Sequence, residues 1–310
     1  FRQTCLEHYL LPARFSMRIS ANRTQLKHDV NRLRLPNGRS LELGRAQEHL
    51  ACIMGIVNIT QDSFFEGSRR PDSIAAIETA LDMVKQGASI IDFGAESTRP
   101  GSTEIDSDEE LSRILPVLNG FRALSDAVVS VDTRHPEVAE AVLAAGADII
   151  NDIEALQRPG MIETVSKAKA AVILMHMQGT PQSMQKDPYY KDCLQEVRSF
   201  LEDRSHRAIE AGISPDRIIL DPGIGFGKLK EHNISLLKGI EHIASLGYPV
   251  LIGLSRKKLI GDLTGRDVAS RLAGSLGAAL AAWLNGAQIL RVHSLCHIVN
   301  ALRAFHEVIQ

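Results

Sequence analysis

The sequence predicts an α/β fold, a single (β/α)8 or TIM barrel, and two observations support this. Eight short apolar segments rich in valine and isoleucine recur along the chain, and each of the first seven is followed by a stretch typical of a helix. Such runs predict strands that are buried on both faces, and strands alternating with helices predict a parallel sheet. Eight units in roughly 250 residues match the number and length of a (β/α)8 barrel.

The predicted strands end in polar residues. Their ranges are Cys52–Asn58, Ser89–Gly94, Val128–Asp132, Asp148–Asp152, Ala171–His176, Ile218–Gly223, Val250–Ser255 and Gln288–His293. In this fold the active site lies where the strands end, so these side chains are expected at one mouth and indicate an enzyme. The expected set is Asn58, Glu96, Asp132, Asn151, Asp152, His176, Asp221, Arg256, Lys257, Arg291 and His293.

Ordinary start and stop signals place most helices. Asp72 or Ser73 is expected to cap the first helix, which stops at Gly87. The others are expected to start at Ser107, to run from His135 to Gly146, and to span 190–211 and 268–285.

The start of the chain differs from the rest. Residues 1–32 are basic but lack the clean apolar core of a targeting peptide, so we expect an N-terminal arm, partly disordered or helical. Leu33–Leu43 alternates around Pro36-Asn37-Gly38, a strong hairpin signal. This hairpin is expected to close the bottom of a single barrel domain spanning 33–310.

Composition excludes several classes of protein. The net charge of −2 gives no electrostatic footprint for nucleic acid or an anionic membrane, and no apolar run is long enough to cross a membrane. The 4 cysteines are scattered without ligand spacing. A reduced, cytoplasmic protein is expected.

One glycine-rich loop follows a strand-end carboxylate, in the run Asp221-Pro-Gly-Ile-Gly-Phe-Gly-Lys228. Glycines let the backbone approach a flat or anionic ligand closely. A buried Asp221 would accept two parallel hydrogen bonds from a guanidine-like or pterin-like edge. The alternative is that Asp221 only caps a turn.

Neighbouring strands offer similar groups, each with a plainer alternative. Asn151 is expected to contact a ligand, and Asp152 to make structural hydrogen bonds. The cations at 256–258 fit a solvated turn, or a lysine that reaches a ligand oxygen or ring nitrogen. Arg291 and His293 lie two residues apart on one face, which suits a phosphate or pyrophosphate. His176, between two methionines, is expected to pack.

A metal site made only of protein is unsupported, because no His, Cys or carboxylate cluster has ligand spacing. Mg²⁺ held jointly by substrate phosphates and one side-chain oxygen stays open.

These residues lie in motifs that resemble those of the bacterial dihydropteroate synthases. The motifs, in family order, are MGIVNITQDSF (54–64), GAESTRPGS (94–102), SVDTRHPEVA (130–139), IINDI (149–153), LMHMQGTPQSMQ (174–185), LDPGIGFGK (220–228), GLSRKKLIG (253–261) and RVH (291–293).

The resemblance implies that a pterin pyrophosphate and p-aminobenzoate are joined to give dihydropteroate, with Mg²⁺ as cofactor. The pterin would be held by Asp132, Asn151, Met175, Asp221 and Lys257. The pyrophosphate would be held by Asn58, Arg291 and His293, with Asn58 also reaching Mg²⁺. Of these, Asn58, Lys257, Arg291 and His293 would be catalytic. p-Aminobenzoate would be held by Asp62, Phe64, Thr98, Arg99, Pro100, Phe226 and Lys258. The resemblance also implies a homodimer through the last helices.

Three positions depart from the family pattern: Gln61 replaces Pro, Lys258 replaces Ser and Ser294 replaces Asp. They gather around the second substrate and the loops. A pterin-binding paralogue with an altered acceptor or little turnover is therefore one alternative. A pterin-binding methyltransferase domain is another, although such domains lack the Ser-Thr-Arg-Pro and Ser-Arg-Lys loops.

Overall fold

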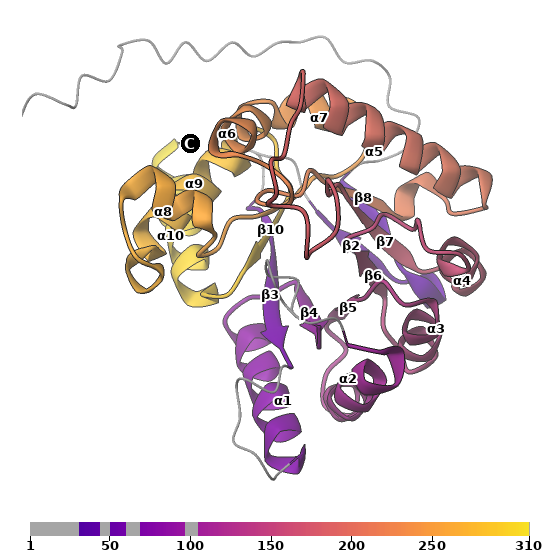
Figure 1. Ribbon diagram of the computed structural model, residues 1–310. Coiled ribbons are helices and arrows are strands. Elements are labelled where there is room, and N and C mark those ends of the chain that lie inside the picture. The colour runs from indigo at the N-terminus through magenta and orange to yellow at the C-terminus, as the bar shows by residue number, and fades with distance from the viewer. Residues whose placement is uncertain (1–30, 44–49, 60–68, 97–104, 310) are drawn as a thin grey trace, which may run out of the picture.

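Eight parallel strands form a closed barrel in the computed structural model, which describes residues 31–43, 50–59, 69–96 and 105–309 (Figure 1). The strands are β3 (Cys52–Asn58), β4 (Ile90–Gly94), β5 (Val128–Asp132), β6 (Ile149–Asp152), β7 (Ala171–Met175), β8 (Ile218–Asp221), β9 (Leu251–Gly253) and β10 (Ile289–Val292). Their order is β8-β7-β6-β5-β4-β3-β10-β9, and a parallel bridge between Leu220 and Val250 joins the two ends. The predicted fold class is confirmed.

Helices surround the sheet in Figure 1. They are α1 (Arg69–Lys85), α2 (Ser107–Arg122), α3 (Pro136–Ala144), α4 (Met161–Ala168), α5 (Cys193–Glu210), α6 (Lys230–Lys238), α7 (Ile240–Ala244), α8 (Lys258–Thr264), α9 (Leu272–Leu284) and α10 (Leu295–Ile309). Short 3-10 helices occur at η1 (Pro36–Gly38), η3 (Pro215–Arg217) and η4 (Val268–Ser270). The eighth strand is thus also followed by a helix, α10, which the sequence analysis did not predict.

Helix starts agree with the capping signals in part. Asp106 caps α2, where its carboxylate accepts a hydrogen bond from the Glu109 N–H at 2.8 Å. The predicted cap of α1 at Asp72 or Ser73 is wrong, because α1 begins at Arg69. A proline is tolerated in a first turn, where the N–H it lacks has no helical acceptor. The helix predicted over 268–285 is divided into η4 and α9.

The strands alternate between two cores. Near the start of each strand, the side chain on the inner face belongs to one buried apolar cluster, which also contains the hairpin leucines. The strand residues of this cluster include Cys52, Ile90, Val128, Ile149, Ala171, Ile219, Leu251 and Ile289. Outward residues pack under the helices in a second cluster. Because side chains alternate with period two, the same inner face carries polar residues at the carboxyl ends of the strands.

The hairpin closes the bottom of the barrel, as predicted. Strands β1 (Arg32–Arg34) and β2 (Ser40–Glu42) pair antiparallel. Asn37 and Gly38 both adopt left-handed φ angles, of 57° and 74°, which suits an Asn-Gly turn. Leu33, Leu35 and Leu43 are buried in the inner cluster. The predicted arm lies mostly outside the described residues, and Arg32 already belongs to β1.

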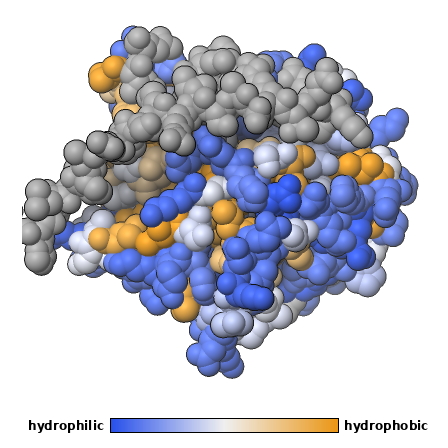
Figure 2. Space-filling model, turned by 90° about the horizontal axis from the view of Figure 1, so that it is seen from above, coloured by the Kyte–Doolittle hydropathy of each residue, from blue (hydrophilic) through white to orange (hydrophobic). Residues whose placement is uncertain are grey.

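The described surface is largely hydrophilic. Seen from above in Figure 2, hydrophobic areas lie mainly toward the left, the side on which α8, α9 and α10 lie in Figure 1. Exposed apolar side chains there include Leu263 and Val268. Within the described part of the chain, every helix is too short or too polar to cross a membrane.

Candidate active site

A partly buried ionic cluster lies inside the mouth of the barrel and joins β4, β5 and β10. Arg291 donates from Nε to Asp92 Oδ2 at 2.7 Å, and its Nη2 lies 2.6 Å from the same oxygen. Nη2 also lies 3.1 Å from Asp132 Oδ2. Asn151 on β6 donates from Nδ2 to Asp92 Oδ2 at 3.4 Å. Three of these four residues were predicted from the sequence; Asp92 was not.

Burial and pairing oppose each other in this cluster. Burial raises the pKa of Asp132 to about 7, and Arg291 offsets part of that rise. For Arg291, burial alone would lower the pKa, but the carboxylates of Asp92 and Asp132 raise it above its ordinary value. Arg291 therefore stays charged. Among the described residues, none makes a hydrogen bond with its Nη1.

The second part of the site is the loop after β8. Asp221 Oδ1 accepts a hydrogen bond from the Gly223 N–H at 2.7 Å. Lys257 Nζ donates to the Ile224 carbonyl at 2.5 Å and lies 4.7 Å from the centre of the Phe226 ring. Burial lowers the pKa of Lys257 to about 8, against the opposing effect of Asp221. Asp221 therefore caps this turn through Oδ1, which was the alternative considered for it. No described residue donates a hydrogen bond to its Oδ2.

The two parts form one electrostatic unit. Arg291 interacts with Asp221 as well as with Asp92 and Asp132. Lys257 interacts with Asp221, Arg291 and Asp132. Burial also raises the pKa of Asp221, while Lys257 and Arg291 lower it. Two cations and three carboxylates therefore lie close enough to shift one another's pKa.

Other predicted residues stand at the rim. Asn58 is the exposed last residue of β3, and Met175 is the buried last residue of β7. His293 follows β10, and its backbone N–H donates to Ser255 Oγ at 3.3 Å. Phe226 is half-buried, and Lys258 is exposed at the start of α8. The predicted loop residues Asp62, Phe64, Thr98, Arg99 and Pro100 lie outside the described residues.

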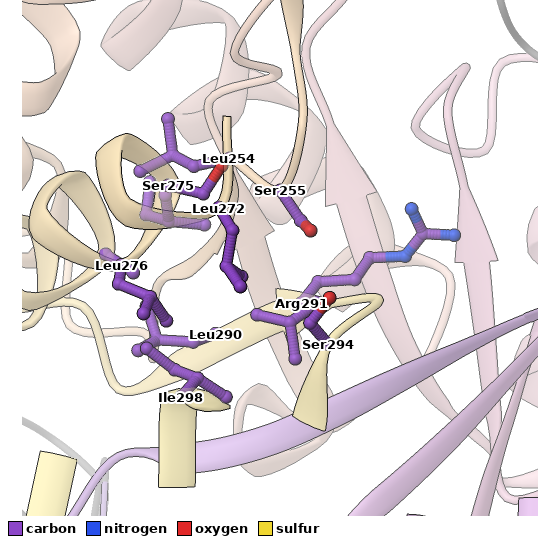
Figure 3. A pocket seen from close by; sticks show the side chains of 12 residues that line it. Leu254, Ser255, Leu272, Ser275, Leu276, Leu290, Arg291, Ser294 and Ile298 are labelled. Atoms are coloured by element: carbon purple, nitrogen blue, oxygen red, sulfur yellow. The ribbon is translucent and has the colours of Figure 1, made fainter. Parts of the chain in front are cut away.

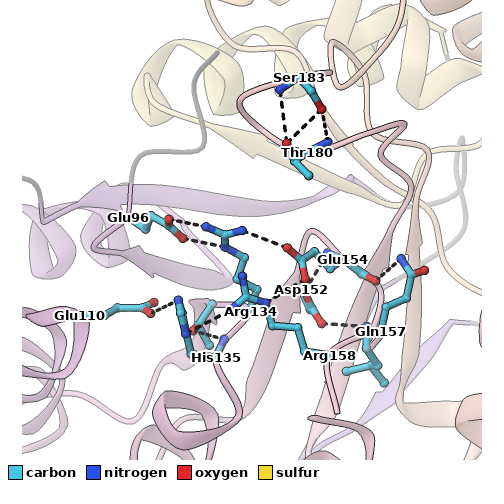
Figure 4. Close-up of polar contacts among 12 residues, drawn as sticks. Glu96, Glu110, Arg134, His135, Asp152, Glu154, Gln157, Arg158, Thr180 and Ser183 are labelled. Atoms are coloured by element: carbon cyan, nitrogen blue, oxygen red, sulfur yellow. Dashed lines mark hydrogen bonds and ion pairs between the residues drawn. The ribbon is translucent and has the colours of Figure 1, made fainter. Parts of the chain in front are cut away.

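Glu96 and Asp152 belong to a separate network at the outer rim (Figure 4). Glu96 holds Arg134 through two contacts, at 3.1 and 2.7 Å, and Arg134 also contacts Glu154 at 3.0 Å. Asp152 accepts hydrogen bonds from the N–H groups of Glu154 and Leu156 at 2.8 and 2.7 Å. The structural role predicted for Asp152 is confirmed, whereas Glu96 does not join the central cluster.

His176 and Arg256 also turn away from the ionic cluster. The His176 ring packs at 4.9 Å from Phe200 and 6.0 Å from Tyr190, as predicted. Burial lowers its pKa to about 3, so the ring is neutral. Arg256 is exposed, and its Nη2 donates to Ser294 Oγ at 3.3 Å.

A small apolar cavity lies behind the site, between β9, β10, α9 and α10 (Figure 3). Its volume of about 20 Å³ is room for one water. Leu272, Leu276 and Ile298 line it, and the Arg291 guanidinium points away from them. The cavity is therefore not part of the polar mouth.

The donor set limits the kind of metal site. Among the described residues, no three His, Cys, Asp or Glu side chains are grouped so that they could hold a metal ion. Asn58 offers a hard amide oxygen at the rim, which suits Mg²⁺ because that ion commonly takes few protein ligands.

Two residues of this region escaped the sequence analysis, Asp92 and Lys228. Asp92 lies inside a strand, two residues before its end, so it faces the same side as Gly94. An acid within an apolar strand was the available signal. Lys228 closes the glycine-rich loop, and its Nζ lies 3.0 Å from His176 Nδ1.

Known proteins share this fold and these motifs. The sequence pattern of the family described as "Pterin binding enzyme" matches residues 54–293. The dihydropteroate synthase of Escherichia coli strain K12 is 42% identical over 266 residues, covering 86% of this chain and 93% of the relative. The Xanthomonas albilineans dihydropteroate synthase with 4-aminobenzoic acid superposes with a TM-score of 0.83 at 43% identity, covering 90% of this chain and 98% of that one. The same enzyme in complex with 7,8-dihydropteroate gives a TM-score of 0.79 at 41% identity, covering 89% and 98%. The barrel, its ionic mouth and these similarities together establish that the chain belongs to the pterin binding enzyme family.

Proposed function

We propose that the protein is a dihydropteroate synthase, a transferase of folate biosynthesis. It would join 6-hydroxymethyl-7,8-dihydropterin pyrophosphate to p-aminobenzoate, giving 7,8-dihydropteroate and pyrophosphate. The observation that carries the proposal is the set of buried and half-buried carboxylates and cations at the mouth, in a chain 42% identical to a known synthase.

The pterin would lie against Asp132, Asn151 and Asp221, whose oxygens accept from its N–H edges. Lys257 would donate to a ring nitrogen or oxygen, and Met175 would pack on the ring. The charged form of Arg291 is favoured by its two carboxylate partners, which supports a role in holding an anion through Nη1. His293 and Asn58, both at the rim, would hold the remaining pyrophosphate oxygens.

The reaction needs little acid–base chemistry. The amine of p-aminobenzoate is neutral near pH 7 and attacks the methylene carbon next to the pterin. A C–N bond forms, the C–O bond to pyrophosphate breaks, and the amine proton is lost to solvent. Arg291 and His293 would stabilise the charge that develops on the leaving pyrophosphate. Positioning of the two substrates would supply most of the remaining acceleration.

Mg²⁺ is the proposed cofactor, with Asn58 as its protein ligand beside substrate oxygens. When bound, the ion supplies neutralisation of the pyrophosphate charge. Asn58→Ala is expected to raise the Mg²⁺ concentration needed for half-maximal rate, whereas equal Mg²⁺ dependence in both proteins would contradict this ligand.

The p-aminobenzoate site would be formed by Phe226, Lys258 and residues of the loops outside the described part, namely Asp62, Phe64, Thr98, Arg99 and Pro100. Lys258 is exposed, so its ammonium would attract the substrate carboxylate through a solvent-screened contact. Lys258→Ser is therefore expected to raise KM for p-aminobenzoate about two- to fivefold, less at 0.5 M salt. Lys230→Ser is the control, because Lys230 is an exposed lysine on α6 outside the proposed site. An unchanged KM would remove Lys258 from the site.

The proposed activity is tested by pyrophosphate release from the pterin substrate with Mg²⁺, with and without p-aminobenzoate. Release that depends on p-aminobenzoate, with dihydropteroate formed, is the expected result. Tight pterin binding without such release would favour a paralogue with an altered acceptor, and Gln61, Lys258 and Ser294 would then be reverted first.

We also propose a homodimer through the last helices. Along α9 the exposed positions Ala273, Gly277 and Ala281 recur every four residues and carry small side chains, so a second helix could approach closely. A Cβ added at Gly277 would meet no atom of another described part of the chain within 4 Å. Gly277→Arg is thus expected to give a folded monomer by light scattering, and an unchanged mass would contradict this interface.

A cytoplasmic location is part of the same proposal. Cys52 and Cys193 are buried free thiols, which suits a reducing compartment. Cell fractionation would test it.

A further inference from the structure

One buried amine holds together the loop that carries Phe226. Lys228 is 4% exposed, and its Nζ lies within hydrogen-bond distance of four groups. These are His176 Nδ1 at 3.0 Å, the His176 carbonyl at 3.2 Å, the Gly223 carbonyl at 3.0 Å and the Phe226 carbonyl at 2.9 Å. Lys228 therefore ties the end of β7 to both ends of the glycine-rich loop.

The partners favour the ammonium form of Lys228. Burial keeps His176 neutral, with a pKa lowered to about 3, so its Nδ1 can accept a hydrogen when Nε2 carries the proton. All four partners then act as acceptors. An ammonium group offers three hydrogens to them, whereas a neutral amine would turn a lone pair toward carbonyl oxygens. Burial lowers the pKa of Lys228 to about 7, and Coulombic interactions with Cys193 and Asp221 oppose that effect.

The loop is rich in glycine, and Lys228 bonds to two of its carbonyls. Gly223, Gly225 and Gly227 all have left-handed φ angles, of 67°, 86° and 62°. Glycines in this region gain the most freedom when contacts are lost. Among the described residues, other side chains make one hydrogen bond each to the loop. Asn233 Oδ1 accepts from the Gly225 N–H at 2.7 Å, and the Gly225, Ile224 and Gly227 carbonyls accept from Gln185, Lys257 and Tyr190.

The acceptors of Lys228 lie next to contacts of the active site. The Gly223 residue that accepts from Lys228 donates its N–H to Asp221. The Phe226 residue that accepts from Lys228 places its ring under Lys257. Asp132, Asn151 and Arg291, by contrast, stand on strands that the sheet holds in register. Loss of the Lys228 contacts should therefore displace Phe226 more than these three strand residues.

We propose that Lys228 is a positioning residue that fixes the 222–227 loop through the Gly223 and Phe226 carbonyls, and thereby sets the affinity for p-aminobenzoate. This inference rests on the proposed function, because Phe226 is assigned to that substrate. It concerns a residue that touches neither substrate.

Lys228→Met tests the proposal, because methionine keeps an unbranched chain and removes the donors and the charge. KM for p-aminobenzoate is expected to rise about tenfold, the effect of one or two lost hydrogen bonds, while the Kd for the pterin substrate changes less than about twofold. Lys230→Met, an exposed neighbour whose Nζ donates to the Asp262 carbonyl, is the matched control and should leave both constants unchanged.

A double-mutant cycle separates positioning from general loosening. Phe226→Ala should raise KM for p-aminobenzoate by itself, and adding Lys228→Met should then have little further effect, because the first change removes what the second displaces. Additive effects on KM would overturn the proposal, as would equal losses of pterin and p-aminobenzoate affinity.

The remaining outcomes are distinguishable. If Lys228→Met does not fold, as judged by circular dichroism, the test uses Lys228→Gln instead, which keeps one amide donor. Failure of both to fold would make Lys228 a requirement of the fold and overturn the positioning role. Failure of the unaltered protein to release pyrophosphate with p-aminobenzoate would instead count against the proposed function.

Discussion

Arg291 determines the charge balance at the barrel mouth. It is paired with Asp92, which is fully buried, and with Asp132. Breaking a buried ion pair by removing one partner is costly, because the other charge stays buried without compensation. Asp92 therefore fixes the orientation of the Arg291 guanidinium through Nε and Nη2.

Asp92→Asn is expected to lower kcat/KM for the pterin substrate about 10- to 100-fold, since a hydrogen bond to a charged group contributes about 1.5–3 kcal/mol. Steady-state pyrophosphate release measures this. Asp216→Asn is the control, because Asp216 pairs with Arg34 in the hairpin region at the other end of the barrel. Equal, small losses in both variants would contradict a role of Asp92 at the site.

Glu110 is a buried acid outside the site, on α2. Burial raises its pKa to about 8 from an ordinary value of 4.5, and a hydrogen bond with Thr133 offsets part of the rise. Between these values the folded protein binds more protons than the unfolded chain, so stability falls as pH rises from 4.5 to about 8.

Glu110→Gln cannot ionise, so its stability is expected to fall less over this pH range than that of the unaltered protein. Urea unfolding at pH 6 and at pH 8.5 measures the difference, with Glu163→Gln, exposed on α4, as control. A parallel decline in both proteins would show that ionisation of Glu110 does not limit stability.

At the scale of elements, the bounds of strands were more predictable than the starts of helices and the pairing of side chains between strands. The bounds of β3 and β5 match the prediction, because an apolar run bounded by turn residues reports burial directly. The start of α1 was missed, since local signals compete within one turn. The pairing of Asp92 with Arg291 could not be predicted, because the two residues lie 199 positions apart in sequence.

The loop after β8 depends on two glycines for close approach. A Cβ at Gly223 would meet the His176 carbonyl oxygen at 1.9 Å, in addition to a φ of +67°. A Cβ at Gly227 would meet the Gln178 carbonyl oxygen at 2.5 Å. Backbone atoms cannot yield cheaply, so this loop and the segment that follows β7 are packed backbone to backbone.

Gly223→Ala is expected to destabilise the protein by well over the ~1 kcal/mol that a left-handed φ alone costs a non-glycine residue, and to weaken substrate binding. Gly265→Ala is the matched control, because Gly265 has a φ of +68° and open space around its Cβ position. Thermal unfolding should separate the two variants, and equal losses would show that only the φ angle matters.

At the scale of the whole molecule, the hairpin completes the core from below. Leu33 and Leu35 are at most 1% exposed and pack with the first residues of the strands, although the hairpin precedes the first barrel strand. An Asn-Gly turn and alternating leucines predicted this element and its place, since an unpaired hairpin must bury its apolar face somewhere.

Leu35→Ala is expected to cost about 2–5 kcal/mol of stability, as for other fully buried leucines, with little change in KM at 20 °C. Leu41→Ala, at a half-buried hairpin position, should cost less. Chemical denaturation compares them. A large change in KM with stability intact would mean that the floor of the barrel communicates with the mouth.

Closure of the barrel bottom by the hairpin also limits the route by which protons reach the interior. Leucines and the apolar first layer lie beneath Asp92, Asp132 and Asp221, so within the described structure hydrogen ions can exchange with these acids only from the open end. A pterin bound above these acids would block proton exchange between them and the solvent. The protonation state set at the moment of binding would then persist through the turnover, and the pH profiles of kcat and of kcat/KM should differ, because only the empty barrel titrates freely.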